Sequence, residues 1–233
     1  MDSPLLDEVI VVNDGSTDSS SEIIKSFKPR IKFINLHKNR GKGFALAKGI
    51  RKSRGEIITF WDADNLNMGE EHVRSLLQPI LKGPARVVLG YRVWKKDTVA
   101  PVQYLTGQRA YYRKDLIPHL KEISRSRFGV EVYLNDVFRG QKTARVPWKD
   151  LRTLQKYQKY SPGKAAQEYV KEGVEIAQTL ARRGAVNLKN DWKRIRKISQ
   201  IKDLKELRKW VGEIENPQIR KILEDYVLQY LPK

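Results

Sequence analysis

Short apolar runs rich in β-branched residues alternate with helical patterns along the N-terminal part of the chain. The runs lie at 9–12, 31–34, 57–61 and 87–89, and the helical patterns lie at 19–27, 44–52 and 69–81. Strands that alternate with helices form a mostly parallel sheet, and runs that are apolar throughout are typical of strands buried on both faces. The sequence therefore predicts an α/β domain whose strands at 9–12 and 57–61 are fully buried.

The C-terminal third has a different pattern. The pairs Ser-Pro at 161–162 and Asn-Pro at 216–217 are typical of helix N-termini, and an apolar stripe at helical spacing follows each of them. A third stripe covers 204–214. We therefore predict two regions, an α/β domain over 1–148 and a helical region over 149–233.

The composition narrows the classes of chemistry and of partner. The chain has no cysteine, which excludes disulfides, a thiolate nucleophile and a Cys-ligated zinc site. Its three histidines are scattered, so we do not expect a His-rich metal site. It carries 46 Lys and Arg against 27 Asp and Glu, a net charge of +19. Such a field favours anionic partners, which are nucleotide phosphates, phospholipid headgroups or nucleic acid. Of these three we do not expect nucleic acid. A merely solvated, lysine-rich surface is the alternative explanation.

No apolar run is long enough to span a bilayer, and the N-terminal sequence MDSPLLDE lacks the basic and apolar parts of a signal peptide. We therefore expect a cytoplasmic protein, with any membrane contact peripheral and at the inner face. The basic cluster at 193–197 surrounds a single isoleucine, Ile195. We expect this cluster to face outward, where it could contact anionic lipid.

Polar clusters follow two of the predicted strands, at the edge where open α/β sheets bind ligands. Asp14, Gly15 and Ser16 follow the first strand, and Asp62, Ala63 and Asp64 follow the third. Two carboxylates separated by one residue can face one divalent cation. Mg²⁺ and Mn²⁺ prefer such oxygen ligands and often share them with a diphosphate.

Between these clusters lies a basic, glycine-containing loop, Arg40, Gly41, Lys42 and Gly43, at the start of a predicted helix. A helix N-terminus with exposed backbone suits phosphate. Each of the three motifs is commonly only a turn or a helix cap. Their order on three successive strand–helix units favours a shared nucleotide site.

The sequences VIVVNDGSTD, NRGKGFALAKGI and GEIITFWDADN together resemble the family 2 glycosyltransferases, which use nucleotide-sugar donors and have the GT-A fold. The resemblance runs in order over about residues 5–92. It implies that Asp14 reads the nucleotide base and that the loop 40–43 lies beside it. It also implies that Asp62 and Asp64 hold Mn²⁺ or Mg²⁺ together with the diphosphate.

The resemblance continues more loosely through 106–110 and 128–132. It places a loop at Gly107, Gln108 and Arg109 beneath the donor sugar, where Arg109 would support a phosphate or the acceptor; a surface arginine is the alternative. Glu131 and Asp136 are the candidate general bases for an inverting transfer. The block Phe-Gly-Val-Glu-Val at 128–132 is also similar to retaining glucosyl-phosphoglycerate synthases, so the stereochemistry stays open. Residues 149–160 lack the histidine that those relatives often use as a metal ligand.

Members of the family normally begin with a further strand and helix that end in a Pro-x-x-Asn-Glu-like turn. The resemblance implies that this chain starts just after that unit, whose strand lies centrally in the sheet. We therefore expect either a fragment or misassigned start, or a sheet that has closed around the loss, because unpaired backbone in mid-sheet is costly.

These observations predict a metal-dependent transfer of a sugar from a UDP- or GDP-linked donor to a hydroxyl or phosphate acceptor, which could be lipid-linked. Two alternatives remain open. One is a non-catalytic basic module that binds lipid or nucleic acid, and the other is a nucleotidyltransferase. The latter is less favoured because its glycine- and Arg/Lys-rich N-terminal phosphate loop is absent from the sequence.

Overall fold

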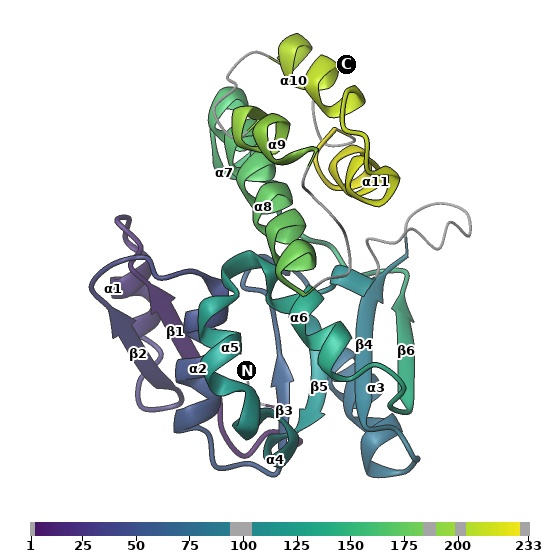
Figure 1. Ribbon diagram of the computed structural model, residues 1–233. Helices are drawn as coiled ribbons and strands as arrows, with labels where there is room; N and C mark the ends of the chain where they lie inside the picture. The colour runs from purple at the N-terminus through teal and green to yellow at the C-terminus, as the bar shows by residue number, and fades with distance from the viewer. Residues whose placement is uncertain (1–2, 94–103, 184–189, 199–203, 229–233) are drawn as a thin grey trace.

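A computed structural model describes residues 3–93, 104–183, 190–198 and 204–228, and shows an α/β part from which a helical region rises (Figure 1). The strands form two sheets. Strands β1 (Ile10–Asp14) and β2 (Lys32–Leu36) make a parallel pair. The other sheet has the order β3-β5-β4-β6, built from the strands β3 (Ile57–Phe60), β4 (Val87–Arg92), β5 (Gln108–Tyr112) and β6 (Thr143–Trp148).

The four-stranded sheet is mixed. Strand β4 pairs in parallel with β6, whereas β5 lies between β3 and β4 and is antiparallel to both. Neither β5 nor β6 is predicted by the sequence pattern, and the family resemblance places a loop at 107–109, where β5 begins. Strand β6 has an alternating rather than a continuous apolar pattern because it lies at the edge of the sheet, where every second side chain is exposed.

Helices cover both faces of this sheet. Helix α3 (Glu70–Leu81) packs Leu76 and Ile80 against Val88 and Ala110 on one face. The other face carries Val87, Leu89 and Tyr111 and packs against several short helices. These are α2 (Lys42–Lys52), α4 (Arg113–Leu116), α5 (Leu120–Arg125) and α6 (Val130–Val137), while α1 (Ser20–Lys25) lies beside β1 and β2.

The helical region has a core of its own. Helix α8 (Pro162–Arg182) connects it to the α/β part, packing against α6 and against the short 3₁₀ turn η3 (Arg127–Gly129). The remaining helices are α7 (Lys156–Lys159), α9 (Trp192–Ile198), α10 (Leu204–Gly212) and α11 (Pro217–Tyr226). The Asn216 side chain accepts the Gln218 and Ile219 backbone N–H groups, each at 3.1 Å, and so caps α11 as predicted.

Two expectations about burial are wrong. Ile195 is 1% exposed, because α9 turns one side into the helical core while its basic residues occupy the other side. The outward-facing cluster is therefore only part of 193–197. Strand β1 and most of β3 are half-buried rather than fully buried, because neither strand has a partner on its second edge within the described residues.

The two sheets are not joined by backbone pairing anywhere in the described part of the chain. The expectation of a sheet that has closed around the missing strand is therefore wrong. Side chains connect them instead. Glu8 precedes β1, forms an ion pair with Lys32, and accepts the backbone N–H groups of Arg54 and Gly55 at 2.5 and 3.2 Å, just before β3. These contacts outweigh the effect of burial and lower the pKa of Glu8. Helix α2 also packs on both β1 and the residues of β3.

Candidate functional site

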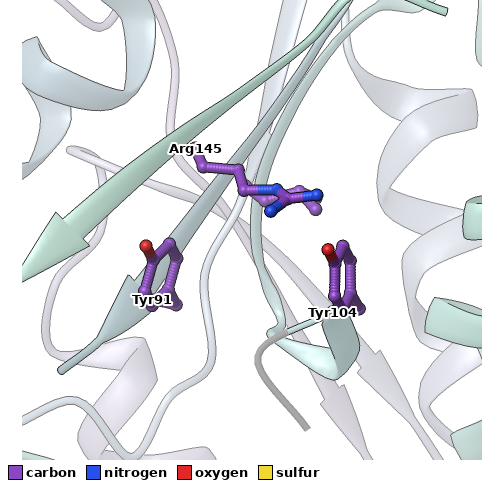
Figure 2. Close-up of a pocket in the computed structure, with 4 residues that line it drawn as sticks. Tyr91, Tyr104 and Arg145 are labelled. Atoms are coloured by element: carbon purple, nitrogen blue, oxygen red, sulfur yellow. The ribbon is translucent and has the colours of Figure 1, made fainter. Parts of the chain in front are cut away.

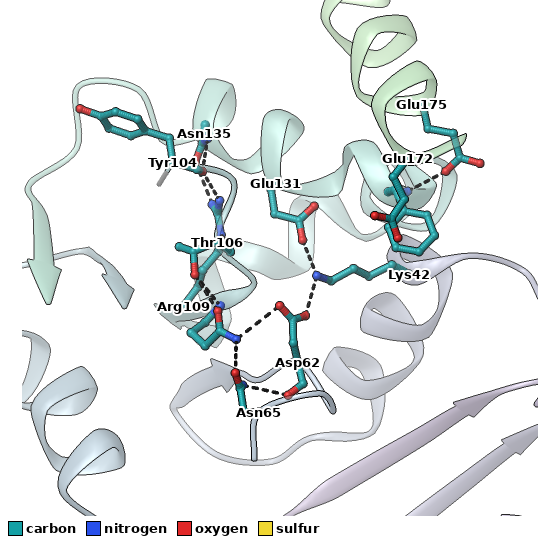
Figure 3. Close-up of polar contacts among 12 residues, drawn as sticks. Lys42, Asp62, Asn65, Tyr104, Thr106, Arg109, Glu131, Asn135, Glu172 and Glu175 are labelled. Atoms are coloured by element: carbon teal, nitrogen blue, oxygen red, sulfur yellow. Dashed lines mark hydrogen bonds and ion pairs between the residues drawn. The ribbon is translucent and has the colours of Figure 1, made fainter. Parts of the chain in front are cut away.

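An ion-paired cluster lies just beyond the carboxyl end of β3. The Lys42 ammonium lies 2.6 Å from a carboxylate oxygen of Asp62 and 2.6 Å from one of Glu131 (Figure 3). Lys42 is the first residue of α2 and Glu131 is in the first turn of α6. The structure thus brings together three predicted site residues from three separate segments.

Burial and charge act in opposite directions on this cluster. Burial by itself lowers the pKa of an ammonium, but the carboxylates of Asp62 and Glu131 outweigh it and raise the pKa of Lys42. Burial likewise raises the pKa of a carboxyl group, but the Lys42 charge outweighs it, and the pKa of Asp62 lies below its ordinary value. Lys42 and Asp62 are therefore both charged at neutral pH.

The residues beside Asp62 fix its position. Gly107 is packed so closely on the Asp62 carboxylate that a Cβ there would overlap both carboxylate oxygens. The Gln108 amide donates to Asp62 at 3.4 Å and to the Asn65 side chain at 3.2 Å, and Asn65 in turn donates to the Asp62 backbone carbonyl at 2.9 Å. The sequence does not predict Asn65 or this role of Gln108, because an isolated amide side chain forms no recognisable motif.

Asp64 has a different environment from Asp62. Its side chain is 37% exposed and pairs with Lys159 of α7 at 3.0 Å. The segment that follows β6 lies along the loop 62–67, with the Leu154 N–H on the Asp64 carbonyl at 2.7 Å and the Leu66 N–H on the Arg152 carbonyl at 2.8 Å. The Asp62-Ala63-Asp64 motif predicts Asp64 as a site residue, but no motif predicts Lys159, which is distant in sequence.

Asp14 holds the basic loop in place. Its two carboxylate oxygens accept the backbone N–H groups of Arg40 at 2.8 Å and Gly41 at 2.7 Å. Gly15 follows with a φ of 74°, and the Ser16 N–H donates to the Asn13 side chain at 3.1 Å. This arrangement is compatible with a binding role for Asp14, and it shows that the carboxylate also orders the loop 40–43.

The start of α2 is in close contact with the turn before α6. Gly41 is the N-cap residue with a φ of 93°, and a Cβ there would be crowded by the Arg127 side chain at 3.1 Å. A Cβ at Gly43 would lie less than 3.0 Å from the Ile123 carbonyl oxygen. Glycine is therefore required at both positions. The α2 N-terminus, an anion-favouring feature, is thereby held directly against Arg127 and Ile123.

Two predicted catalytic residues lie outside the ion-paired cluster of Lys42, Asp62 and Glu131: Arg109 is buried beside it, and Asp136 points away from it. Arg109 is 1% exposed and donates to Tyr111, Asn135 and the backbone carbonyls of Tyr104 and Thr106. It cannot be the surface arginine of our alternative, because its guanidinium is buried and held by these acceptors. Asp136 pairs with Arg139 and Arg183 instead of joining Glu131. The two carboxylates of α6 point in different directions because they are five residues apart on a helix.

The donor set fits a divalent ion that is shared with a substrate. Mg²⁺ and Mn²⁺ are commonly held by one or two carboxylates together with substrate phosphates and water. Asp62 and Asp64 can supply the two carboxylates, whereas Ala63 between them, also a predicted site residue, has no side-chain ligand atom. Within the described residues no group of three or more acidic or histidine side chains could form a metal site made by protein alone.

A separate small pocket lies by the ends of β4 and β6 (Figure 2). Leu89, Tyr91, Tyr104 and Arg145 line it, and the Arg145 guanidinium lies over the Tyr104 ring at 4.5 Å from its centroid. The Tyr104 carbonyl also accepts from Arg109, so the pocket touches the same hydrogen-bond network as the ion-paired cluster.

Comparison with known proteins identifies the family. The sequence profile described as "Glycosyl transferase family 2" matches residues 2–141. The chain belongs to this family, as the sequence motifs predicted. The GT-A fold class is confirmed as well: glucosyl-3-phosphoglycerate synthase from Mycobacterium tuberculosis, crystallised with Mn²⁺, UDP-glucose and phosphoglyceric acid, superposes with a TM-score of 0.58. The sequences are 23% identical, and the match covers 78% of this chain and 70% of that one.

Relatives in sequence include dolichyl-phosphate beta-glucosyltransferases. The one from Dictyostelium discoideum is 33% identical over 117 residues, which are 47% of this chain and 34% of the relative. The one from Trichomonas vaginalis is 45% identical over 67 residues, which are 28% of this chain and 20% of the relative. The chain thus spans about a third or less of the length of these relatives. Among the described residues, none of the helices combines the length and hydropathy that a membrane span requires.

Proposed function

We propose that this chain transfers a sugar from a nucleoside-diphosphate donor to a hydroxyl or phosphate acceptor with the help of Mn²⁺ or Mg²⁺. The observation that carries the proposal is the meeting of Lys42, Asp62 and Glu131 at the end of β3. The family supports glycosyl transfer, and relatives crystallised with UDP-glucose and Mn²⁺, or with UDP and Mg²⁺, support the donor class and the metal.

The residues of the site have separate roles in this proposal. Asp62 and Asp64 hold the divalent ion, which when bound neutralises charge on the leaving diphosphate. Asp14 and the loop 40–43 bind the nucleotide, with the α2 N-terminus favouring its negative charge. For an inverting transfer, Glu131 accepts the proton of the acceptor hydroxyl, because it lies at the cluster whereas Asp136 does not.

The first experiment is a calorimetric titration of the full chain with UDP and with GDP, in the presence of Mn²⁺, of Mg²⁺ or of EDTA. We expect one of the nucleotides to bind with metal and at least tenfold more weakly in EDTA, and Asp64→Asn to bind as the wild type does in EDTA. A lost carboxylate contact of this kind costs about 1.5–3 kcal/mol. Binding of equal strength in EDTA would remove the metal from the proposal.

We also propose a lipid-linked acceptor, a polyprenyl phosphate, approached from an anionic membrane surface. Helix α9 exposes Lys193, Arg196 and Lys197 on one side, and Trp192 beside them is 48% exposed. Basic residues next to an exposed tryptophan suit a lipid headgroup region. The dolichyl-phosphate relatives support the acceptor class.

Cosedimentation with vesicles tests the membrane contact. We expect the protein to sediment with phosphatidylglycerol vesicles at low salt, and not with phosphatidylcholine vesicles or at high salt, because each basic residue near an anionic surface contributes about 1 kcal/mol. The triple replacement of Lys193, Arg196 and Lys197 by glutamine should abolish most of this binding. Undiminished sedimentation of the triple variant would show that α9 is not the contact.

A further inference from the structure

Each aspartate of the Asp62-Ala63-Asp64 motif has a lysine of its own, and the two lysines come from different parts of the chain. Lys42 belongs to α2 and bridges Asp62 to Glu131. Lys159 belongs to α7, at the start of the helical region, and contacts Asp64. The Asp62 and Asp64 side chains are similarly exposed, at 30% and 37%, but Lys42 also holds a second carboxylate, Glu131, whose side chain is only 8% exposed.

The buried second partner of Lys42 decides which of the two lysines can exchange its aspartate for a ligand. Lys42 satisfies two carboxylates at once, and its departure would leave Glu131 buried without a counter-charge, which is strongly unfavourable. Lys159 satisfies one carboxylate that solvent already reaches, and an exposed ion pair of this kind is weak. A divalent ion that enters the site therefore displaces Lys159 far more easily than Lys42.

Side-chain contacts of the residues that precede Lys159 keep it at this position. The Asn67 side chain donates to the Asp150 carbonyl at 2.9 Å and accepts the Arg152 N–H at 2.7 Å. Lys156 of the same short helix pairs with the buried Glu172 of α8 at 2.7 Å. An ammonium that loses Asp64 thus stays within reach of whatever binds there, because only its flexible side chain has to move.

We propose that Lys159 is the cation that neutralises Asp64 in the unliganded protein, and that it becomes a ligand of the donor diphosphate once a divalent ion has taken Asp64. The proposal rests on the proposed function, since it needs a diphosphate at the Asp62-Ala63-Asp64 motif. It assigns to the helical region a residue that touches the substrate.

The two roles give Lys159→Gln opposite effects on two ligands. For the metal alone the variant should bind more tightly, by about two- to fivefold, because a competing charge is removed from a partly exposed carboxylate. For a nucleoside diphosphate in saturating metal it should bind about tenfold more weakly, because a charge-assisted contact is lost. A residue with only a structural role would not produce this crossed result.

The experiment measures Mn²⁺ binding by electron paramagnetic resonance without nucleotide, and UDP or GDP binding by calorimetry with saturating Mn²⁺. Wild type, Lys159→Gln, Lys159→Arg and the control Lys171→Gln are compared, with circular dichroism to confirm folding. Lys171 is an exposed lysine of α8, so its replacement makes the same change of charge in the same region. We expect the arginine variant to retain nucleotide binding and the control to match the wild type.

Unchanged Mn²⁺ and nucleotide affinities in Lys159→Gln would overturn the proposal, and so would tighter binding of both ligands, which would make Lys159 a competitor only. If the wild type binds neither nucleotide with Mn²⁺ or Mg²⁺, the proposed function fails and the diphosphate role fails with it. If the wild type binds and Lys159→Gln binds equally well, the proposed function stands and only this inference fails.

Discussion

Replacing Lys42 by methionine should destabilise the protein by about 3 kcal/mol and abolish nucleotide binding. Methionine keeps most of the side-chain volume but leaves the Asp62 and Glu131 carboxylates facing each other without a cation. Removal of one partner from a buried ion pair costs about 3–5 kcal/mol, and the partial exposure of Lys42 and Asp62, 23% and 30%, favours the lower end. Chemical denaturation gives the stability, and calorimetry with UDP and GDP gives the binding.

A matched control separates the ion pair from a general effect of charge. Lys52 is the last residue of the same helix and is exposed, so Lys52→Met removes an equal charge without leaving a buried carboxylate unpaired. We expect Lys52→Met to change the free energy of unfolding by less than about 0.5 kcal/mol. Equal losses in the two variants would mean that Lys42 contributes no more than surface charge does.

Two glycines of α2 should respond to alanine with opposite signs. In Gly43→Ala the new methyl group would overlap the Ile123 backbone carbonyl, so α2 and α5 would have to separate, and we expect a loss of about 2 kcal/mol or more. In Gly49→Ala the methyl group would meet only a Val12 methyl at 3.7 Å, which is ordinary contact. There we expect a gain of about 0.5–1 kcal/mol, since alanine restricts the unfolded chain.

Thermal and urea unfolding of the two glycine variants measure this difference directly. Because Gly43 sits in the loop 40–43, its variant should also bind nucleotide more weakly, whereas Gly49→Ala should bind as the wild type does. A stabilised Gly43→Ala variant would show that α2 can move away from α5 at no cost. The close approach would then have no part in shaping the site.

The parts of the fold that the sequence predicts are those with local signals. The apolar runs, the turns after them and the Asn-Pro start of α11 are each contained in a few residues, and all of them correspond to observed elements. Strands β5 and β6 were missed because their partners are remote. Each is identified as a strand mainly by pairing with β4, and an alternating or mixed pattern such as that of β6 is ambiguous without the partner.

The same distinction applies to the candidate site. Asp14, Lys42, Asp62 and Asp64 lie in motifs whose order along the chain predicts their proximity. The choice between Glu131 and Asp136 could not be made from sequence, because it depends on which face of α6 meets Lys42. The sequence could not predict that Arg109 is buried either, because the acceptors that hold its guanidinium include the backbone carbonyls of Tyr104 and Thr106, which carry no sequence signal.

The strap of backbone contacts between the loop 62–67 and the residues after β6 has a consequence for synthesis on the ribosome. Asp64 leaves the ribosome long before Thr153 and Lys159, the residues that pair with its loop and its carboxylate. Domains generally fold as they emerge, from the N-terminal end. In this chain Asp64 would lack its partner Lys159 until the segment after residue 148, our predicted boundary, has been made. A chain that stopped at that boundary would contain the three motifs that carry the family resemblance and still lack the residues that pair with the loop 62–67 and with Asp64.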